Sequence, residues 1–223
     1  MFISIHIPKT AGTTVAYILD YGTNRRIFYD YEEDYDKPPP TEYLNRHREF
    51  INDKFDVIHG HFLYKKYASA FPDEKYIATL RHPVSRVISQ YNHILDEPPG
   101  TGAWPTAEIL SGDMDIVEFA GIYNIGNAQS VFLDGRRFED YAHIFITERL
   151  EQSIALFQKK FLFARQDVYA GQGLPKINIR STRQRYYKPS KAEEQEIFKR
   201  TRDDNELYAK AIERHKAEVK KYF

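Results

Sequence analysis

The first fifteen residues, Met1-Phe-Ile-Ser-Ile-His-Ile-Pro-Lys-Thr-Ala-Gly-Thr-Thr-Val15, contain the pattern that decides the fold. The apolar residues that open this stretch predict a short buried strand. Apolar residues at helical spacing from Val15 onward predict a helix that Thr13 or Thr14 would cap. A helix N-terminus presents backbone N–H groups and the positive end of the helix dipole, so this order of elements predicts an anion-binding loop.

Two residues of this loop suit the binding of a phosphate or sulfate group. Gly12 lets the backbone approach a ligand closely, and Lys9 adds a positive charge. The loop is not a Walker A sequence, because that pattern places its lysine directly after the second glycine, whereas Lys9 precedes the loop's glycine. A strand, turn and helix without any ligand stays open as the alternative.

Composition limits the classes of protein that remain. The chain has 223 residues, of which 42% are hydrophobic and 29% charged, and this suits a single globular domain over residues 1–223. The formal net charge is zero, which argues against a nucleic-acid partner. The chain has no cysteine, so disulfides and zinc–thiolate sites are excluded.

The sequence carries no recognisable membrane or targeting segment. No apolar stretch approaches the roughly 20 residues of a membrane-spanning helix. The N-terminus has neither a basic region nor a cleavage site, because Met1 leads straight into the first predicted strand. We therefore expect no membrane span and a cytoplasmic location.

Strand and helix patterns alternate along the chain. Buried-strand patterns lie at residues 2–7, 25–29, 55–59, 75–80 and 143–147, and helical patterns lie at 42–52, from 83 onward, at 150–161 and, broken near Asp203, at 191–223. This alternation predicts an α/β fold: one P-loop-like domain with a central, mainly parallel sheet flanked by helices. Ligands of such sheets bind beyond the carboxyl ends of the strands, where the first loop lies.

A second motif, Leu80-Arg-His-Pro-Val-Ser-Arg-Val-Ile-Ser-Gln-Tyr91, follows the fourth predicted strand. Arg81 lies at the end of that strand, and Ser89 lies two turns into the helix that begins near Pro83. An arginine offers a two-pronged donor and a serine a compact hydroxyl donor, and both suit a phosphate group. Arg86, on the same helix, is an alternative phosphate ligand.

A third motif, His59-Gly60-His61, follows the third predicted strand. An imidazole, with an unperturbed pKa of about 6.5, is suited to accept a proton near neutral pH. Hydrogen bonding to backbone carbonyls at the sheet edge is the alternative for either histidine. A zinc site is a weaker interpretation, since no third ligand stands at a useful spacing.

Together these motifs resemble the sulfotransferases that use 3′-phosphoadenosine 5′-phosphosulfate (PAPS), in particular the carbohydrate branch that includes heparan sulfate 2-O- and 6-O-sulfotransferases. The resemblance implies that the first loop holds the 5′-phosphosulfate and that Arg81 and Ser89 hold the 3′-phosphate. It further implies that His61 is the general base, with His59 in support, and that a basic segment near the C-terminus covers the nucleotide. The residues thus expected to bind PAPS are Lys9, Thr10, Ala11, Gly12, Thr13, Thr14, Arg81, Ser89, Arg180, Ser181 and Thr182.

The same resemblance implies the reaction. A sulfuryl group passes from PAPS to a hydroxyl of a carbohydrate or other alcohol by in-line displacement, 3′,5′-ADP leaves, and Lys9 stabilises the leaving group. No metal is required, because the lysine and the loop already supply positive charge. The segment Asn127-Ala-Gln129 also resembles a family segment near the site, with its role open. A P-loop-type ATP-dependent kinase and a non-catalytic nucleotide- or glycan-binding module remain the alternatives.

Overall fold

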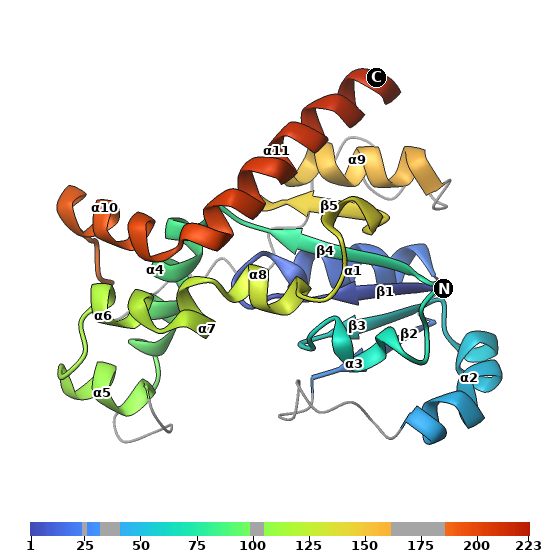
Figure 1. Cartoon of the computed structure of the whole chain (residues 1–223), viewed down its shortest axis with the longest axis horizontal. Coiled ribbons are helices and arrows are strands. Elements are labelled where there is room, and N and C mark those ends of the chain that lie inside the picture. The colour runs from blue at the N-terminus through green and yellow to red at the C-terminus, as the bar shows by residue number, and fades with distance from the viewer. Residues whose placement is uncertain (24–25, 32–40, 99–104, 162–185) are drawn as a thin grey trace.

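The computed structural model describes residues 1–23, 26–31, 41–98, 105–161 and 186–223. Five strands form one sheet in the order β2-β3-β1-β4-β5, and every pairing between them is parallel (Figure 1). The strands are β1 (Phe2–Ile5), β2 (Ile27–Asp30), β3 (Val57–Gly60), β4 (Lys75–Leu80) and β5 (His143–Ile146). The predicted α/β fold with a central parallel sheet is confirmed.

Helices cover both faces of the sheet and gather beyond the carboxyl ends of its strands. They are α1 (Gly12–Gly22), α2 (Thr41–Lys54), α3 (Lys65–Ala68), α4 (Pro83–Ile94), α5 (Thr106–Ser111), α6 (Ile116–Gly121), α7 (Tyr123–Gly126), α8 (Ala128–Leu133), α9 (Leu150–Phe161), α10 (Lys191–Arg200) and α11 (Arg202–Tyr222), with short 3₁₀ turns η1 (Phe138–Asp140) and η2 (Thr147–Arg149). None of the helices in the described part of the chain combines the length and the apolar character that crossing a bilayer requires.

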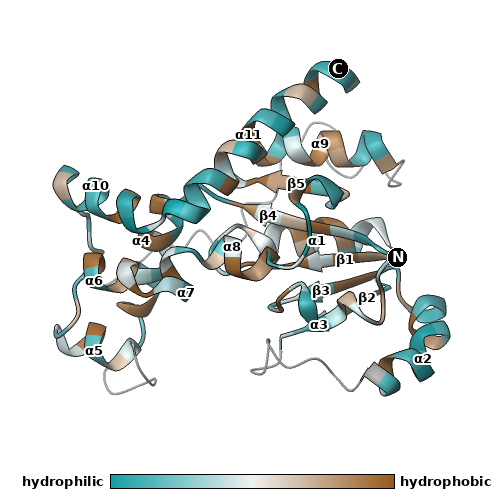
Figure 2. Cartoon of the chain, viewed as in Figure 1, coloured by the Kyte–Doolittle hydropathy of each residue, from teal (hydrophilic) through white to brown (hydrophobic). Residues whose placement is uncertain are grey.

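Two hydrophobic cores sandwich the sheet because strand side chains alternate between its faces. On one face, α1 and α9 pack on Val57 and Phe145 through residues such as Leu19 and Phe157. On the other face, α3, α8 and α11 pack around a cluster that includes Ile5. The strands are therefore hydrophobic, whereas α2, α10 and α11 expose mostly hydrophilic residues (Figure 2).

A third core holds the helices that stand beyond the strands. The strand arrows point toward the side on which α4, α5, α6, α7 and α10 gather (Figure 1). Val87 of α4, Ile109 of α5, Phe119 of α6 and Ile197 of α10 pack together there and are almost fully buried. This group forms a wall opposite the carboxyl ends of the strands.

The observed boundaries of the fourth strand, of α4 and of the last two helices lie close to the predicted ones. The fourth strand runs from Lys75 to Leu80 as predicted, and α4 begins at Pro83, whose missing N–H suits a first turn. The predicted break in the last helical stretch lies at Thr201, two residues before Asp203.

Candidate active site

The loop between β1 and α1 holds two non-glycine residues in the left-handed conformation. Lys9 has a φ of 69° and Ala11 a φ of 66°. Such a residue costs roughly 1–3 kcal/mol and persists only where its surroundings impose it. Here the Thr10 hydroxyl donates to the Ile7 carbonyl at 2.8 Å, and the Thr147 hydroxyl lies 2.9 Å from the Thr10 carbonyl oxygen. The fold thus holds this loop in a strained shape from two sides.

The start of α1 has no side-chain cap. Its N-cap is Ala11, which has no hydroxyl, so the prediction of Thr13 or Thr14 as the cap was wrong. The left-handed turns bring Gly12 into the helix and place both threonines inside its first turn. An external anion can take the place of a capping side chain at such a helix start, where the dipole favours negative charge.

A cavity of about 740 Å³ opens at this helix start. Its walls include the loop, His61 beyond β3, Arg81 beyond β4 and Ser89 of α4. A cavity of this size is in the usual range for small-molecule sites. The predicted PAPS-binding residues that line it are Lys9, Ala11, Gly12, Thr13, Thr14, Arg81 and Ser89. The structure therefore brings three separate sequence motifs to one cavity.

Arg81 is held in place by contacts on two sides. Its backbone N–H donates to Oε1 of Gln129 at 2.8 Å, and its Nη1 donates to the Lys9 carbonyl at 3.1 Å. Gln129 is in turn fixed by the buried carboxylate of Asp204 on α11, which accepts from its backbone N–H and its Nε2, each at 3.1 Å. The segment from Asn127 to Gln129, whose role the sequence left open, thus supports Arg81.

Arg86, the alternative phosphate ligand, does not line the cavity. It is fully buried, its Nη1 donates to Gln90 at 2.6 Å, and its Nη2 donates to the Ile125 carbonyl. Its Nε lies 4.0 Å from the Asp204 carboxylate. Burial lowers the pKa of the guanidinium to about 10, although Asp204 opposes that shift. Of the two α4 residues considered, only Ser89 lines the cavity.

Three histidines form a cluster beside the loop. The ring of His6 lies 4.4 Å from that of His61 and stacks on that of His59 at 5.2 Å, measured between centroids. Burial lowers the pKa of His6 to about 2, that of His59 to about 3 and that of His61 below its usual 6.5. All three rings are therefore neutral near pH 7, and His61 can accept a proton.

The structure separates the two histidines of the His-Gly-His motif. His61 lines the cavity, and its buried Nε2 has no hydrogen-bond partner among the described residues. His59 does not line the cavity: it is fully buried, its Nδ1 lies 2.8 Å from the hydroxyl of Ser4, and its Nε2 likewise has no partner among the described residues. The arrangement places His61 at the cavity wall and His59 in the packing of the sheet.

Some predicted site residues do not reach the cavity. The side chain of Thr10 is fully buried and shapes the loop through its bond to Ile7. Arg180, Ser181 and Thr182 lie outside the described residues. Conversely, His6 lines the cavity and was not predicted, although its place directly after β1 is a signal that could have found it.

Within the ranges that the structure describes, no group of three or more histidine, aspartate or glutamate side chains is arranged to hold a metal ion. The three clustered histidines instead pack ring against ring.

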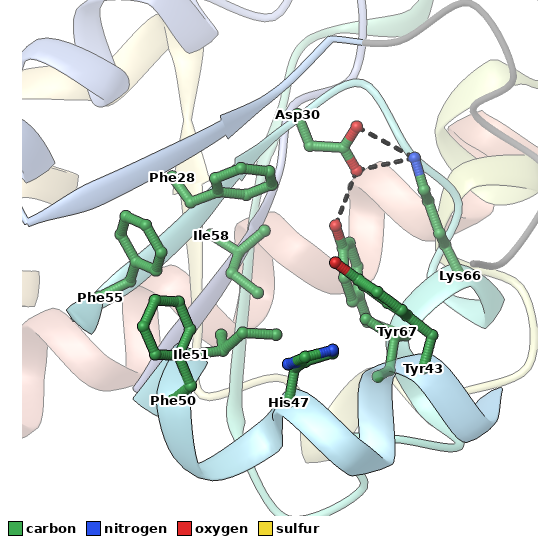
Figure 3. A pocket seen from close by; sticks show the side chains of 11 residues that line it. Phe28, Asp30, Tyr43, His47, Phe50, Ile51, Phe55, Ile58, Lys66 and Tyr67 are labelled. Carbon is green, nitrogen blue, oxygen red and sulfur yellow. Dashed lines mark hydrogen bonds and ion pairs between the residues drawn. The ribbon is translucent and has the colours of Figure 1, made fainter. Parts of the chain in front are cut away.

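A second cavity, of about 800 Å³, lies under α2 (Figure 3). One end is apolar, with Phe28, Phe50 and Phe55 among its walls. At the other end the buried Asp30 carboxylate pairs with the Lys66 ammonium at 2.8 Å and accepts from the Tyr67 hydroxyl at 2.9 Å. Since strand side chains alternate, this cavity and the histidine cluster lie on opposite faces of the sheet.

The fold is a parallel α/β sheet whose first strand leads through a strained loop into an uncapped helix start, and this helix start lines a cavity. Residues 1–114, just over half of the chain, match the sequence profile described as Sulfotransferase family. The chain belongs to this family. It is therefore a sulfotransferase, and membership implies that it takes its sulfuryl group from PAPS.

The wider comparisons add the following. No curated protein matches the chain. Among solved structures, the chain is similar to a sulfotransferase from Alicyclobacillus acidocaldarius, with 17% identity, 94% of each chain covered and a TM-score of 0.48.

Proposed function

We propose that this enzyme transfers the sulfuryl group of PAPS to a hydroxyl of a carbohydrate or another alcohol. One observation carries the proposal: a single cavity is lined by Lys9, the start of α1, Arg81, Ser89 and His61. Positive charge suits the donor's phosphates and sulfate, and a neutral imidazole suits the acceptor's hydroxyl. The carbohydrate branch of the family is proposed on the motif resemblance alone.

PAPS supplies the sulfuryl group: as the acceptor oxygen bonds to sulfur, the bond from sulfur to the 5′-phosphate oxygen breaks, and 3′,5′-ADP leaves. His61 takes the hydroxyl proton of the acceptor on its unpartnered Nε2. Lys9 and the start of α1 stabilise the negative charge that grows on the departing phosphate oxygen. These groups supply the needed charge without a metal ion.

Arg81 and Ser89 hold the 3′-phosphate in this proposal. The support is positional, because both side chains line the cavity and Arg81 is fixed by Gln129 and Lys9. An arginine fork binds a phosphate through two parallel hydrogen bonds. A preference for a 3′-phosphate would distinguish this enzyme from an ATP-dependent kinase.

Calorimetric titration with 3′,5′-ADP and with ATP tests the donor assignment. We expect 3′,5′-ADP to bind more tightly than ATP and to lose most of its affinity in Arg81→Ala. Arg137→Ala is the matched control, since Arg137 is exposed and only approaches Glu139 at 3.9 Å. Tighter binding of ATP would favour the kinase alternative and contradict the proposal.

An acceptor screen with PAPS tests the reaction itself. Release of 3′,5′-ADP that depends on an added carbohydrate or alcohol supports the transfer. Binding of 3′,5′-ADP without turnover of PAPS on any acceptor would favour the non-catalytic module.

A further inference from the structure

His6 occupies a position in the cavity wall that the mechanism above does not use. It follows β1 directly and lines the cavity together with the loop and His61. Only 9% of the residue is exposed, although the imidazole is polar. A buried polar ring at the wall of a transfer site calls for a functional explanation.

The imidazole of His6 lies against the start of α1. A Cβ atom added to Gly12 would fall 1.8 Å from Cδ2 and 2.1 Å from Nε2 of this ring. The ring edge that carries Nε2 therefore faces the first residue of the helix. An anion bound at that helix start is a neighbour of this edge.

The opposite nitrogen of the ring is bound by a tyrosine. Nδ1 of His6 lies 2.9 Å from the hydroxyl of Tyr31. Burial raises the pKa of Tyr31 to about 12, so the phenol keeps its proton and can donate it to Nδ1. A neutral imidazole that accepts at Nδ1 carries its one proton at Nε2. An anion beside Nε2 favours this same tautomer.

We propose that His6 donates a hydrogen bond from Nε2 to a non-bridging oxygen of the sulfuryl group during transfer, with Tyr31 setting the tautomer. This inference rests on the proposed function. In the transfer step His61 takes the acceptor's proton while His6 keeps its own. His6 thus adds a donor to the anion site without adding a charge, and Tyr31 acts as a positioning residue.

If His6 contacts the sulfuryl group, its loss lowers kcat and leaves the affinity for 3′,5′-ADP unchanged. If His6 only supports the loop, its loss lowers both. The product 3′,5′-ADP has no sulfuryl group, so it cannot report a contact to a sulfuryl oxygen. We expect His6→Ala to lower kcat about 100-fold, as for the loss of one donor to a reacting oxyanion, and to leave the affinity for 3′,5′-ADP unchanged. His6→Gln retains a donor of similar reach, and we expect it to recover part of the lost kcat.

Two further variants complete the experiment. Tyr31→Phe keeps the ring and removes the hydroxyl, and we expect a several-fold lower kcat with unchanged 3′,5′-ADP affinity. His47→Gln is the control, because His47 lines the cavity under α2 (Figure 3). If His6→Ala does not fold, as judged by circular dichroism, the comparison of His6→Gln and Tyr31→Phe with the unsubstituted enzyme decides.

Clear results would overturn the proposal. An unchanged kcat in the His6 variants would show that His6 makes no contact to the sulfuryl group that matters for transfer. A parallel loss of kcat and 3′,5′-ADP affinity would show that His6 only supports the loop. A wild-type enzyme that neither binds 3′,5′-ADP nor turns over PAPS would instead refute the proposed function, which is a different result.

Discussion

The two cavities of this protein are similar in size and opposite in character. The cavity at the start of α1 measures about 740 Å³ and the one under α2 about 800 Å³. In the first, Nε2 of His61 is buried without a partner among the described residues. In the second, the buried carboxylate of Asp30 is satisfied by Lys66 and Tyr67 (Figure 3). An unsatisfied polar group at a cavity wall, more than the volume of the cavity, indicates a site for chemistry.

The paired strands β2 and β3 form a wall between the two cavities, because Asp30 lines one cavity and His61 lines the other. The close pairing of these strands explains the glycine between the two histidines. The backbone N–H of His61 donates to the Asp30 carbonyl at 3.0 Å. A Cβ atom at Gly60 would lie 1.6 Å from that same oxygen. Only glycine allows β2 and β3 to approach so closely here, so the wall positions His61 through the backbone. The variants below test whether chemistry belongs to one cavity and structural support to the other.

Replacing His61 has the largest expected effect. We expect His61→Ala to lower kcat by between about 100-fold and 10,000-fold, because a general base is lost. The lowered pKa of His61 means that the ring stays neutral to a pH below 6.5. In the unsubstituted enzyme kcat/KM should therefore rise with pH through a value below 6.5 and then level off. A pH–rate profile of both proteins checks this, and an unchanged acidic limb in the variant would contradict the assignment.

Lys9→Ala is expected to follow in size. Loss of one group that stabilises a developing negative charge costs about 100-fold to 1,000-fold in kcat. Lys65→Ala, on an exposed lysine of α3, is the control and should have no effect. Steady-state turnover of PAPS measures both. If kcat is equal in the two variants, Lys9 does not stabilise the leaving group, and the assignment of the reaction to the loop cavity is contradicted.

The sequence alone predicted the order of strands and helices and the meeting of Lys9 and His61 at one edge of the sheet. Periodic apolar residues, Pro83 and the small loop residues set the strands, the helices and their order, because these signals are local. The convergence of Lys9, His61 and Arg81 was predictable because the carboxyl ends of parallel strands share one edge.

Features that depend on tertiary contacts could not be predicted. The loop with the left-handed Lys9 and Ala11 is held partly by Thr147, which lies far along the chain and contacts the Thr10 carbonyl. The buried guanidinium of Arg86 donates to the Ile125 carbonyl and approaches Asp204 of the last helix, and both residues are distant in sequence. His6 directly follows β1, but its contacts to His59, His61 and Tyr31 come from separate segments and depend on the fold.

Gln129→Leu is expected to have a smaller effect, on binding. The substitution removes the acceptor for the Arg81 backbone N–H and the side-chain bond to Asp204, while the backbone bond to Asp204 remains. Loss of one such buried hydrogen bond costs roughly 1.4 kcal/mol, or about tenfold in the affinity for 3′,5′-ADP. Gln152→Leu is the matched control, because that amide bonds His215. Equal calorimetric affinities in the two variants would mean that Gln129 does not position Arg81.

The smallest effect on activity is expected from the charge pair of the second cavity. Asp30→Asn leaves the Lys66 ammonium buried without its counter-charge, and such a break costs about 3–5 kcal/mol in the free energy of unfolding. The double variant Asp30→Asn with Lys66→Met removes both charges and keeps an acceptor for the Tyr67 hydroxyl. We expect it to regain much of that stability in urea unfolding.

In both of these variants kcat per folded molecule should stay unchanged, because the carbonyl of Asp30, and not its carboxylate, holds His61. A loss of kcat in the stable double variant would show that the pair does more than support the wall. The division between a reactive cavity and a structural one would then be wrong, because removing the charge pair under α2 would have changed the activity of His61.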